Sequence, residues 1–151
     1  MGVLSNLEPK EVFAFFEEIS QIPRPSHQEE KISKYLLHFA KERGLEHYRD
    51  EKHNVIIIKE ASEGYEAEPP IILQGHMDMV TEKAADCSKD MENEGLDLYV
   101  DGEWLHAKGT TLGADDGIGV AFELALLDSD DIEHGPIECL FTRDEETSLS
   151  G

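Results

Sequence analysis

Two residues near the middle of the chain, His76 and Asp78, could form part of a metal site. They are two positions apart, so on an extended chain both side chains point to the same face. The imidazole could then bind a metal ion while the carboxylate accepts the other ring N–H, which fixes the tautomer. The alternative is a histidine at a strand end beside a solvated aspartate. Because this spacing is common, the pair taken alone favours the alternative.

Asp115 and Asp116 lie in a glycine-rich segment, GADDG. Gly113 and Gly117 would allow the backbone to bend sharply and to approach a ligand closely. One carboxylate with both oxygens free could bridge two cations. Either aspartate could instead cap the helix that follows, which is the usual role of aspartate there and the better interpretation of this segment by itself.

A third acidic pair, Glu145 and Glu146, follows an apolar segment and is preceded by Asp144. Adjacent carboxylates repel one another unless cations or solvent relieve the repulsion. One of the pair could bind a metal ion while the other acts as general base toward a water molecule. A solvated acidic turn is the alternative. The residues themselves do not indicate which glutamate would have which role.

The apolar segments place these clusters beside expected strands. Apolar runs at 55–58 and 71–73 are typical of strands inside a covered sheet, and 137–141 predicts a further strand. Segments 98–100 and 103–105 flank an Asp-Gly turn and predict a hairpin. The sequence therefore predicts an α/β fold with a mixed β-sheet flanked by helices, the hairpin supplying an antiparallel pair. Ligand sites in open α/β sheets gather just after the strands, where 76–78 and 144–146 lie.

Helices are expected in three places. The first begins at Pro9, a favourable first-turn residue, and the second begins at Ser26, which would form a capping box with Glu29. The third follows the GADDG segment. Its expected inward side chains are Ile118, Ala121, Phe122, Ala125 and Leu126.

The bulk composition restricts the class of protein. The 151 residues suit one domain, and 34 acidic against 13 basic residues give a formal net charge of −21. Such a surface repels phosphate backbones, so we expect no nucleic-acid partner. No apolar stretch approaches the roughly 20 residues of a membrane span, and no signal peptide is visible. With Cys87 and Cys139 too far apart for a disulfide framework, we expect a cytoplasmic protein in which Cys139 belongs to the core.

The three clusters together favour a catalytic metal site. Carboxylates plus one imidazole, without thiolates, favour Zn²⁺, Mn²⁺ or Co²⁺ over a structural zinc finger. The segments IILQGHMDMV, GTTLGADDGIGVA and GPIECLFTRDEETSLSG closely resemble the metal-site motifs of co-catalytic zinc exopeptidases. More narrowly, they resemble the cytosolic aminoacyl-histidine dipeptidases (Xaa-His dipeptidases, peptidase D). IPRPSHQEEKISKYLLHFA and NVIIIKEASEGYE fit the same family.

The resemblance implies a role for each candidate. His76 would bind one zinc ion, Asp115 would bridge two, and Glu146 would bind the second. Glu145 would be the general base, and Asp78 would accept the second ring N–H of His76. The other histidines are expected to be structural or surface residues.

The resemblance also implies features of the surrounding protein. Residues 1–151 would be the N-terminal part of a zinc-exopeptidase catalytic domain. Two further ligands, an aspartate and a histidine, would lie beyond Gly151, as would a lid domain that binds substrate and mediates homodimerisation. Many relatives have asparagine where this chain has Asp116, and they hold the bond before it as a cis peptide.

The expected activity is hydrolysis of the peptide bond of Xaa-His dipeptides by the full-length enzyme. It would use two Zn²⁺ ions, with Mn²⁺ or Co²⁺ as substitutes, and the 151-residue chain alone would be inactive. One alternative is a related exopeptidase or deacylase of different specificity. Another is a truncated, non-catalytic chain that folds and at most binds metal weakly.

Overall fold

The computed structural model describes residues 2–151 as a mixed α/β structure. The helices are α1 (Lys10–Ser20), α2 (Glu30–Glu42) and α3 (Ala114–Asp128). The strands are β1 (Glu46–Arg49), β2 (Val55–Lys59), β3 (Ile71–His76), β4 (Leu98–Asp101), β5 (Trp104–Ala107) and β6 (Ile137–Thr142). The predicted α/β class is therefore confirmed, although β1 had not been expected.

The main sheet has four strands in the order β1-β2-β6-β3. The β1–β2 and β2–β6 pairs are antiparallel, whereas β3 and β6 are parallel, so the sheet is mixed. The expected hairpin exists, but β4 and β5 form a separate two-stranded sheet. The prediction that the hairpin makes the main sheet mixed was therefore wrong. The antiparallel pairs of that sheet come from β1, β2 and β6.

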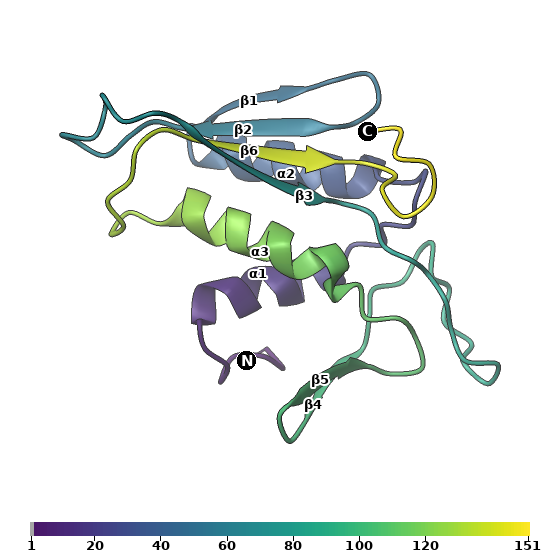
Figure 1. Cartoon of the computed structure of the whole chain (residues 1–151). Helices are drawn as coiled ribbons and strands as arrows, with labels where there is room; N and C mark the ends of the chain where they lie inside the picture. Colours follow the sequence, from purple (N-terminus) through teal and green to yellow (C-terminus); the bar gives the residue numbers. More distant parts are fainter. Residues whose placement is uncertain (1) are drawn as a thin grey trace.

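The hydrophobic core lies on one face of the main sheet. Alternate side chains on a strand point to opposite faces, and on β2 and β6 one alternating set is buried and the other is half-buried. The buried set is Val55, Ile57, Ile137, Cys139 and Phe141. Figure 1 shows the helices gathered on one side of the sheet, with α1 beside α3. Phe15 on α1 also contacts Phe39 on α2, with ring centroids 5.6 Å apart.

Two expectations about the buried faces were wrong. Helix α3 buries Val120, Ala121, Leu124 and Leu127, whereas Phe122 is 49% exposed. From Ile118 to Leu127 every residue except Gly119 and Glu123 is apolar, so the hydrophobic periodicity does not select a face. The start of β3 is also exposed, because β3 is an edge strand.

The parallel pairing of β3 with β6 positions the candidate residues. His76, at the end of β3, is paired with Thr142, at the end of β6. The segments that follow the two strands therefore leave the sheet at the same edge, and the N–H of Met77 donates to the carbonyl of Thr142 at 2.7 Å. None of the helices in residues 2–151 has both the length and the apolar character needed to cross a bilayer.

Candidate metal centre

The structure brings together one residue from each of the three acidic clusters. His76, Asp115 and Glu146 each offer a ligand atom, and these atoms all lie within 4.8 Å of one another. The Nε2 atom of His76 is 3.1 Å from Asp115 Oδ1 and 3.7 Å from Glu145 Oε2. His76 is buried, whereas the side chain of Asp115 is 90% exposed, so the group is open to solvent on the Asp115 side.

Hydrogen bonding fixes the direction of the His76 ring. Its Nδ1 lies 2.9 Å from the backbone carbonyl of Asp78 and 3.4 Å from the Asp78 carboxylate. A carbonyl can only accept, so Nδ1 carries a proton. Nε2 faces Asp115 and Glu145: it donates to Asp115 when the ring is protonated, and it presents its lone pair when the ring is neutral. The carboxylate of Asp78 was expected to accept this N–H. The backbone oxygen of Asp78 lies nearer to Nδ1 than its carboxylate does.

The Asp78 carboxylate orients the Glu145–Glu146 segment. Its side chain is fully buried, and its oxygens accept the backbone N–H groups of Glu145 at 3.0 Å and Glu146 at 3.2 Å. The hydroxyl of Ser26 donates to the same carboxylate at 2.6 Å. Ser26 therefore does not cap α2, and the expected capping box is wrong: no side chain caps the start of that helix.

Asp115 and Asp116 lie in the first turn of α3, where their dihedral angles are not helical. The peptide bond between them is cis, as the resemblance implied. Gly113 precedes them with φ +68°, a conformation that favours glycine. The carboxylate of Asp116 points toward the sheet, near Gly75 and Glu123. Burial, together with the charge of Asp115, raises the pKa of Asp116 despite the attraction of His76.

The group is strongly acidic. Within the described part of the chain, His76 is the one basic side chain that pairs with Asp115 or Glu145. Burial lowers the pKa of His76, but hydrogen bonds to Asp115 and to the Asp78 carbonyl outweigh it, so the net shift is upward. Burial and the charges of Asp115 and Glu145 raise the pKa of Glu146. The group therefore favours a proton or another cation.

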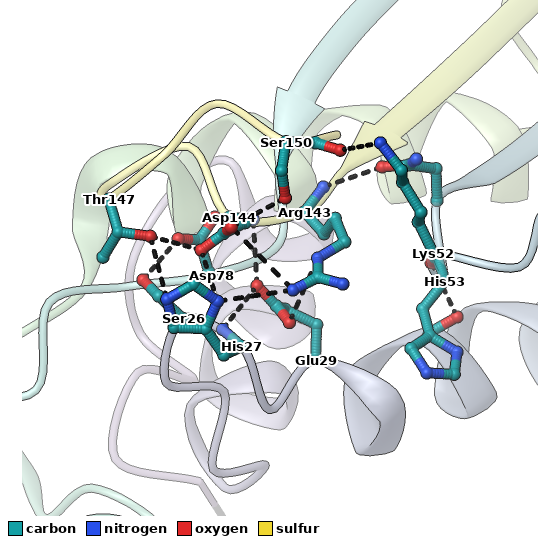
Figure 2. A network of polar contacts seen from close by, with 12 residues as sticks. Ser26, His27, Glu29, Lys52, His53, Asp78, Arg143, Asp144, Thr147 and Ser150 are labelled. Carbon is teal, nitrogen blue, oxygen red and sulfur yellow. Dashed lines mark hydrogen bonds and ion pairs between the residues drawn. The ribbon is translucent and has the colours of Figure 1, made fainter.

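A buried hydrogen-bond network holds the loop that contains the two glutamates (Figure 2). The Asp144 carboxylate accepts the hydroxyls of Thr147, Ser148 and Ser150, and it pairs with His27 Nδ1 at 3.1 Å. Burial alone would raise the pKa of Asp144, but these hydrogen bonds and His27 hold it well below its usual range. The loop therefore closes around an ionised carboxylate.

A second carboxylate group, formed by Glu29, Asp78 and Asp144, is entirely buried. Glu29 Oε1 accepts the backbone N–H groups of His27 at 3.1 Å and Asp144 at 2.9 Å. The oxygens of Asp78 and Asp144 also have donors from the protein. The remaining oxygen, Glu29 Oε2, accepts no hydrogen bond but lies 3.8 Å from Arg143 Nε. This second group therefore supports the loop, and its charge is partly matched by Arg143.

The first group has a suitable donor set for a divalent metal. It combines one neutral imidazole nitrogen with carboxylate oxygens and contains no thiolate, a combination that suits Zn²⁺, Mn²⁺ or Co²⁺. The His76 nitrogen that would bind the ion is Nε2, which faces Asp115, whereas Nδ1 is occupied by the Asp78 carbonyl. His76, Asp115 and Glu146 thus fit such an ion.

Sequence reasoning missed the residues that support this group. Ser26, His27 and Glu29 lie before or near the start of α2, yet they contact segments more than 50 residues away. Arg24, between two prolines, is fully buried and contacts the same edge of the sheet. No local pattern marks such residues. A buried charge inside an otherwise structural segment becomes visible once the fold is known.

Comparisons with known proteins confirm the resemblance. Over all 151 residues the chain is 43% identical to the cytosol non-specific dipeptidase of Escherichia coli, of which it covers 31%. The crystal structure of an aminoacylhistidine dipeptidase from Vibrio alginolyticus matches 99% of the chain with a TM-score of 0.96 and 45% identity. A tripeptidase from Staphylococcus aureus matches 91% with a TM-score of 0.70 and 25% identity.

The chain spans about a third of the length of these proteins: 31% of the Vibrio alginolyticus chain and 37% of the Staphylococcus aureus chain. No family model matches it.

Proposed function

We propose that this chain is part of a metal-dependent dipeptidase whose substrates include Xaa-His dipeptides. The observation that carries the proposal is the convergence of His76, Asp115 and Glu146 within 4.8 Å, with Glu145 beside them. The names of the Escherichia coli and Vibrio alginolyticus proteins support dipeptide hydrolysis, although the second name specifies aminoacyl-histidine substrates and the first is non-specific. A cytoplasmic location and homodimerisation through a lid are part of the same proposal.

His76 Nε2 and the Glu146 carboxylate would each hold one of two divalent ions, and Asp115 would bridge them. When bound, the ions would polarise the scissile carbonyl and lower the pKa of water. Asp78 keeps the proton of His76 on Nδ1, so that Nε2 stays free to bind. It also fixes the backbone at both glutamates, which sets the side chain of Glu145 beside the ligand group.

Glu145 would act as the general base. Its side chain is 45% exposed, so it can reach both solvent and a bound dipeptide, and Oε2 lies 3.7 Å from His76 Nε2. It would take a proton from the attacking water and give it to the leaving amine. The backbone N–H of Glu145 is held by Asp78, which fixes the point of the chain from which this side chain extends.

The experiment is an assay of the full-length protein with Xaa-His dipeptides, other dipeptides, tripeptides and N-acyl amino acids. We expect Xaa-His hydrolysis that EDTA abolishes and that Zn²⁺, Mn²⁺ or Co²⁺ restores. Glu145→Gln should lower kcat by about 10²–10⁴-fold, the usual contribution of a general base, while metal affinity stays within a few-fold of the wild type. Glu60→Gln, at an exposed position, is the matched control.

Hydrolysis that survives both EDTA and Glu145→Gln would contradict the proposal. A preference for tripeptides or N-acyl amino acids over every dipeptide would instead support a related exopeptidase or deacylase.

A further inference from the structure

Arg24 is a buried cation that has no acidic partner. Its side chain is 1% exposed, and no carboxylate among the residues that the structure describes lies within ion-pairing distance of it. Burying a charge without a partner is costly, so such a residue requires an explanation.

The guanidinium donates to backbone carbonyls from two different segments. Nη1 donates to the carbonyl of Met77 at 3.0 Å and lies 3.4 Å from that of Asp78. Nη2 donates to the carbonyl of Gly113 at 2.7 Å. Met77 directly follows His76, and Gly113 lies two residues before Asp115. The planar fork of one arginine therefore links the two segments that contain these candidate ligands.

The backbone at Arg24 and Pro25 also contacts the segment that follows His76. Its carbonyl accepts the N–H of Met79 at 3.1 Å, and Pro25 forms a bridge with Met79. The Asp78 carbonyl that lies beside Nη1 also accepts the hydrogen bond from His76 Nδ1–H. The guanidinium is therefore in contact with the oxygen that sets the direction of the His76 ring.

Two glycines leave the space that the guanidinium occupies. A Cβ at Gly113 would be 2.8 Å from Nη2, and a Cβ at Gly117 would be 2.5 Å from it. Both distances are shorter than a side-chain contact allows. Glycine is therefore required at these two positions for a reason besides backbone flexibility: a larger residue would collide with Arg24 where it lies between α3 and the end of β3.

We infer that Arg24 is a positioning residue for the metal centre, fixing the separation of His76 from Asp115 by bonding the backbone next to each. The inference rests on the proposed function. Burial lowers the pKa of Arg24 to about 10, against the opposing attraction of Asp78 and Asp116, so the guanidinium remains charged at neutral pH. A lysine would keep that charge, but its single ammonium lacks the fork that reaches both segments.

The test compares Arg24→Lys, Arg24→Met and Gly117→Ala in the full-length protein, with Co²⁺ as the probe. Co²⁺ affinity is measured by calorimetry, and the geometry of its ligands is measured by visible absorption. Gly117→Ala keeps Arg24 but places a methyl group against Nη2, and it tests the same contact if Arg24→Met does not fold. Lys59→Met is the matched control, because Lys59 Nζ also donates to two carbonyls, those of Leu126 and Ser129, at the other end of α3.

We expect the Arg24 variants and Gly117→Ala to bind Co²⁺ about tenfold or more weakly and with a changed absorption spectrum, at temperatures well below their unfolding transitions. Lys59→Met should lose thermal stability but keep the wild-type affinity and spectrum. Wild-type affinity and spectrum in Arg24→Lys and Gly117→Ala would overturn the inference while leaving the metal centre intact. A wild-type protein that takes up no Co²⁺ would instead overturn the proposed function itself.

Discussion

Asp78 joins two parts of the candidate centre through one buried carboxylate and one backbone carbonyl. The carbonyl accepts the His76 ring proton, and the carboxylate accepts the N–H groups of Glu145 and Glu146. In Asp78→Asn, the amide NH₂ would face one of these N–H donors and lose that hydrogen bond. The geometry of the ligands should suffer even though no proposed ligand has been changed.

We expect Asp78→Asn to weaken Zn²⁺ binding by about 10–100-fold, the usual effect of removing a partner that orients metal ligands. Calorimetric titration of the full-length protein measures this change. Asp86→Asn, at an exposed position, should bind like the wild type. Equal affinities for the Asp78 variant and the wild type would show that the backbone alone orients His76 and Glu146.

The candidate site residues could be predicted from the sequence where they belong to a motif. The three acidic clusters, read alone, each had an ordinary structural explanation, and their convergence depends on β3 and β6 being parallel neighbours. The supporting residues could not be predicted. Ser26 is the clearest case, because its spacing to Glu29 fits a capping box, yet its hydroxyl bonds to Asp78, 52 positions away. Long-range partners of this kind compete with local patterns and leave no periodic signal.

At the scale of elements, α3 contains a buried acid that its sequence pattern would place outside. Glu123 is 4% exposed and lies against the sheet beside Asp116, with one carboxylate oxygen lacking any hydrogen-bond partner. Burial, with the nearby charge of Asp116, raises the pKa of Glu123 to about 8. The carboxyl group is therefore protonated in the folded protein at neutral pH.

This shift makes the stability of the fold depend on pH. Below about pH 4 the carboxyl group is protonated in both the folded and unfolded chains, so it costs nothing. As the pH rises from about 4.3 toward 8, the unfolded chain releases the proton while the folded chain keeps it, and stability is lost at up to about 1.4 kcal/mol per pH unit. The loss ends above the folded pKa.

Glu123→Gln removes this dependence. Between pH 5 and pH 7, the free energy of unfolding of the wild type should fall relative to the variant by about 2–3 kcal/mol. Urea denaturation at both pH values, with EDTA present, measures the difference. A difference between the two proteins that does not change with pH would show that Glu123 is ionised in the folded state.

Element types were easier to predict than element faces. The helices and most strands followed from their apolar periodicity and turn residues, whereas the buried face of α3 and the exposure of β3 did not. Ile71 and Ile72 form a continuous apolar run with Leu73, but they lie on an edge strand and are 57% and 66% exposed. A run of β-branched residues predicts a strand, and its neighbours decide whether that strand is covered.

At the scale of the whole molecule, the described chain supplies only part of the proposed dinuclear centre. With Asp115 shared, each ion would have two protein ligands, and about four are usual for zinc. One face of the main sheet is also only half-covered. Both features agree with a chain that matches about a third of the length of its relatives.

The 151-residue chain by itself should therefore show no dipeptide hydrolysis at saturating Zn²⁺, Mn²⁺ or Co²⁺. Its metal affinity should be weaker than that of the full-length protein, because water must replace the missing ligands. A chromogenic assay for released histidine, run on both proteins side by side, makes the comparison. Turnover by the short chain that Glu145→Gln abolishes would show that these residues assemble a working site without further ligands.

The most direct test of the metal centre is a crystal structure of the full-length protein grown with Mn²⁺ or Zn²⁺, with anomalous scattering used to locate the ions. We predict two peaks about 3.5–4 Å apart. One should lie within about 2.0–2.2 Å of His76 Nε2 and the other within a similar distance of a Glu146 oxygen, with Asp115 contacting both. Ions that bind elsewhere, with His76 Nε2 and Asp115 left without metal, would contradict the account.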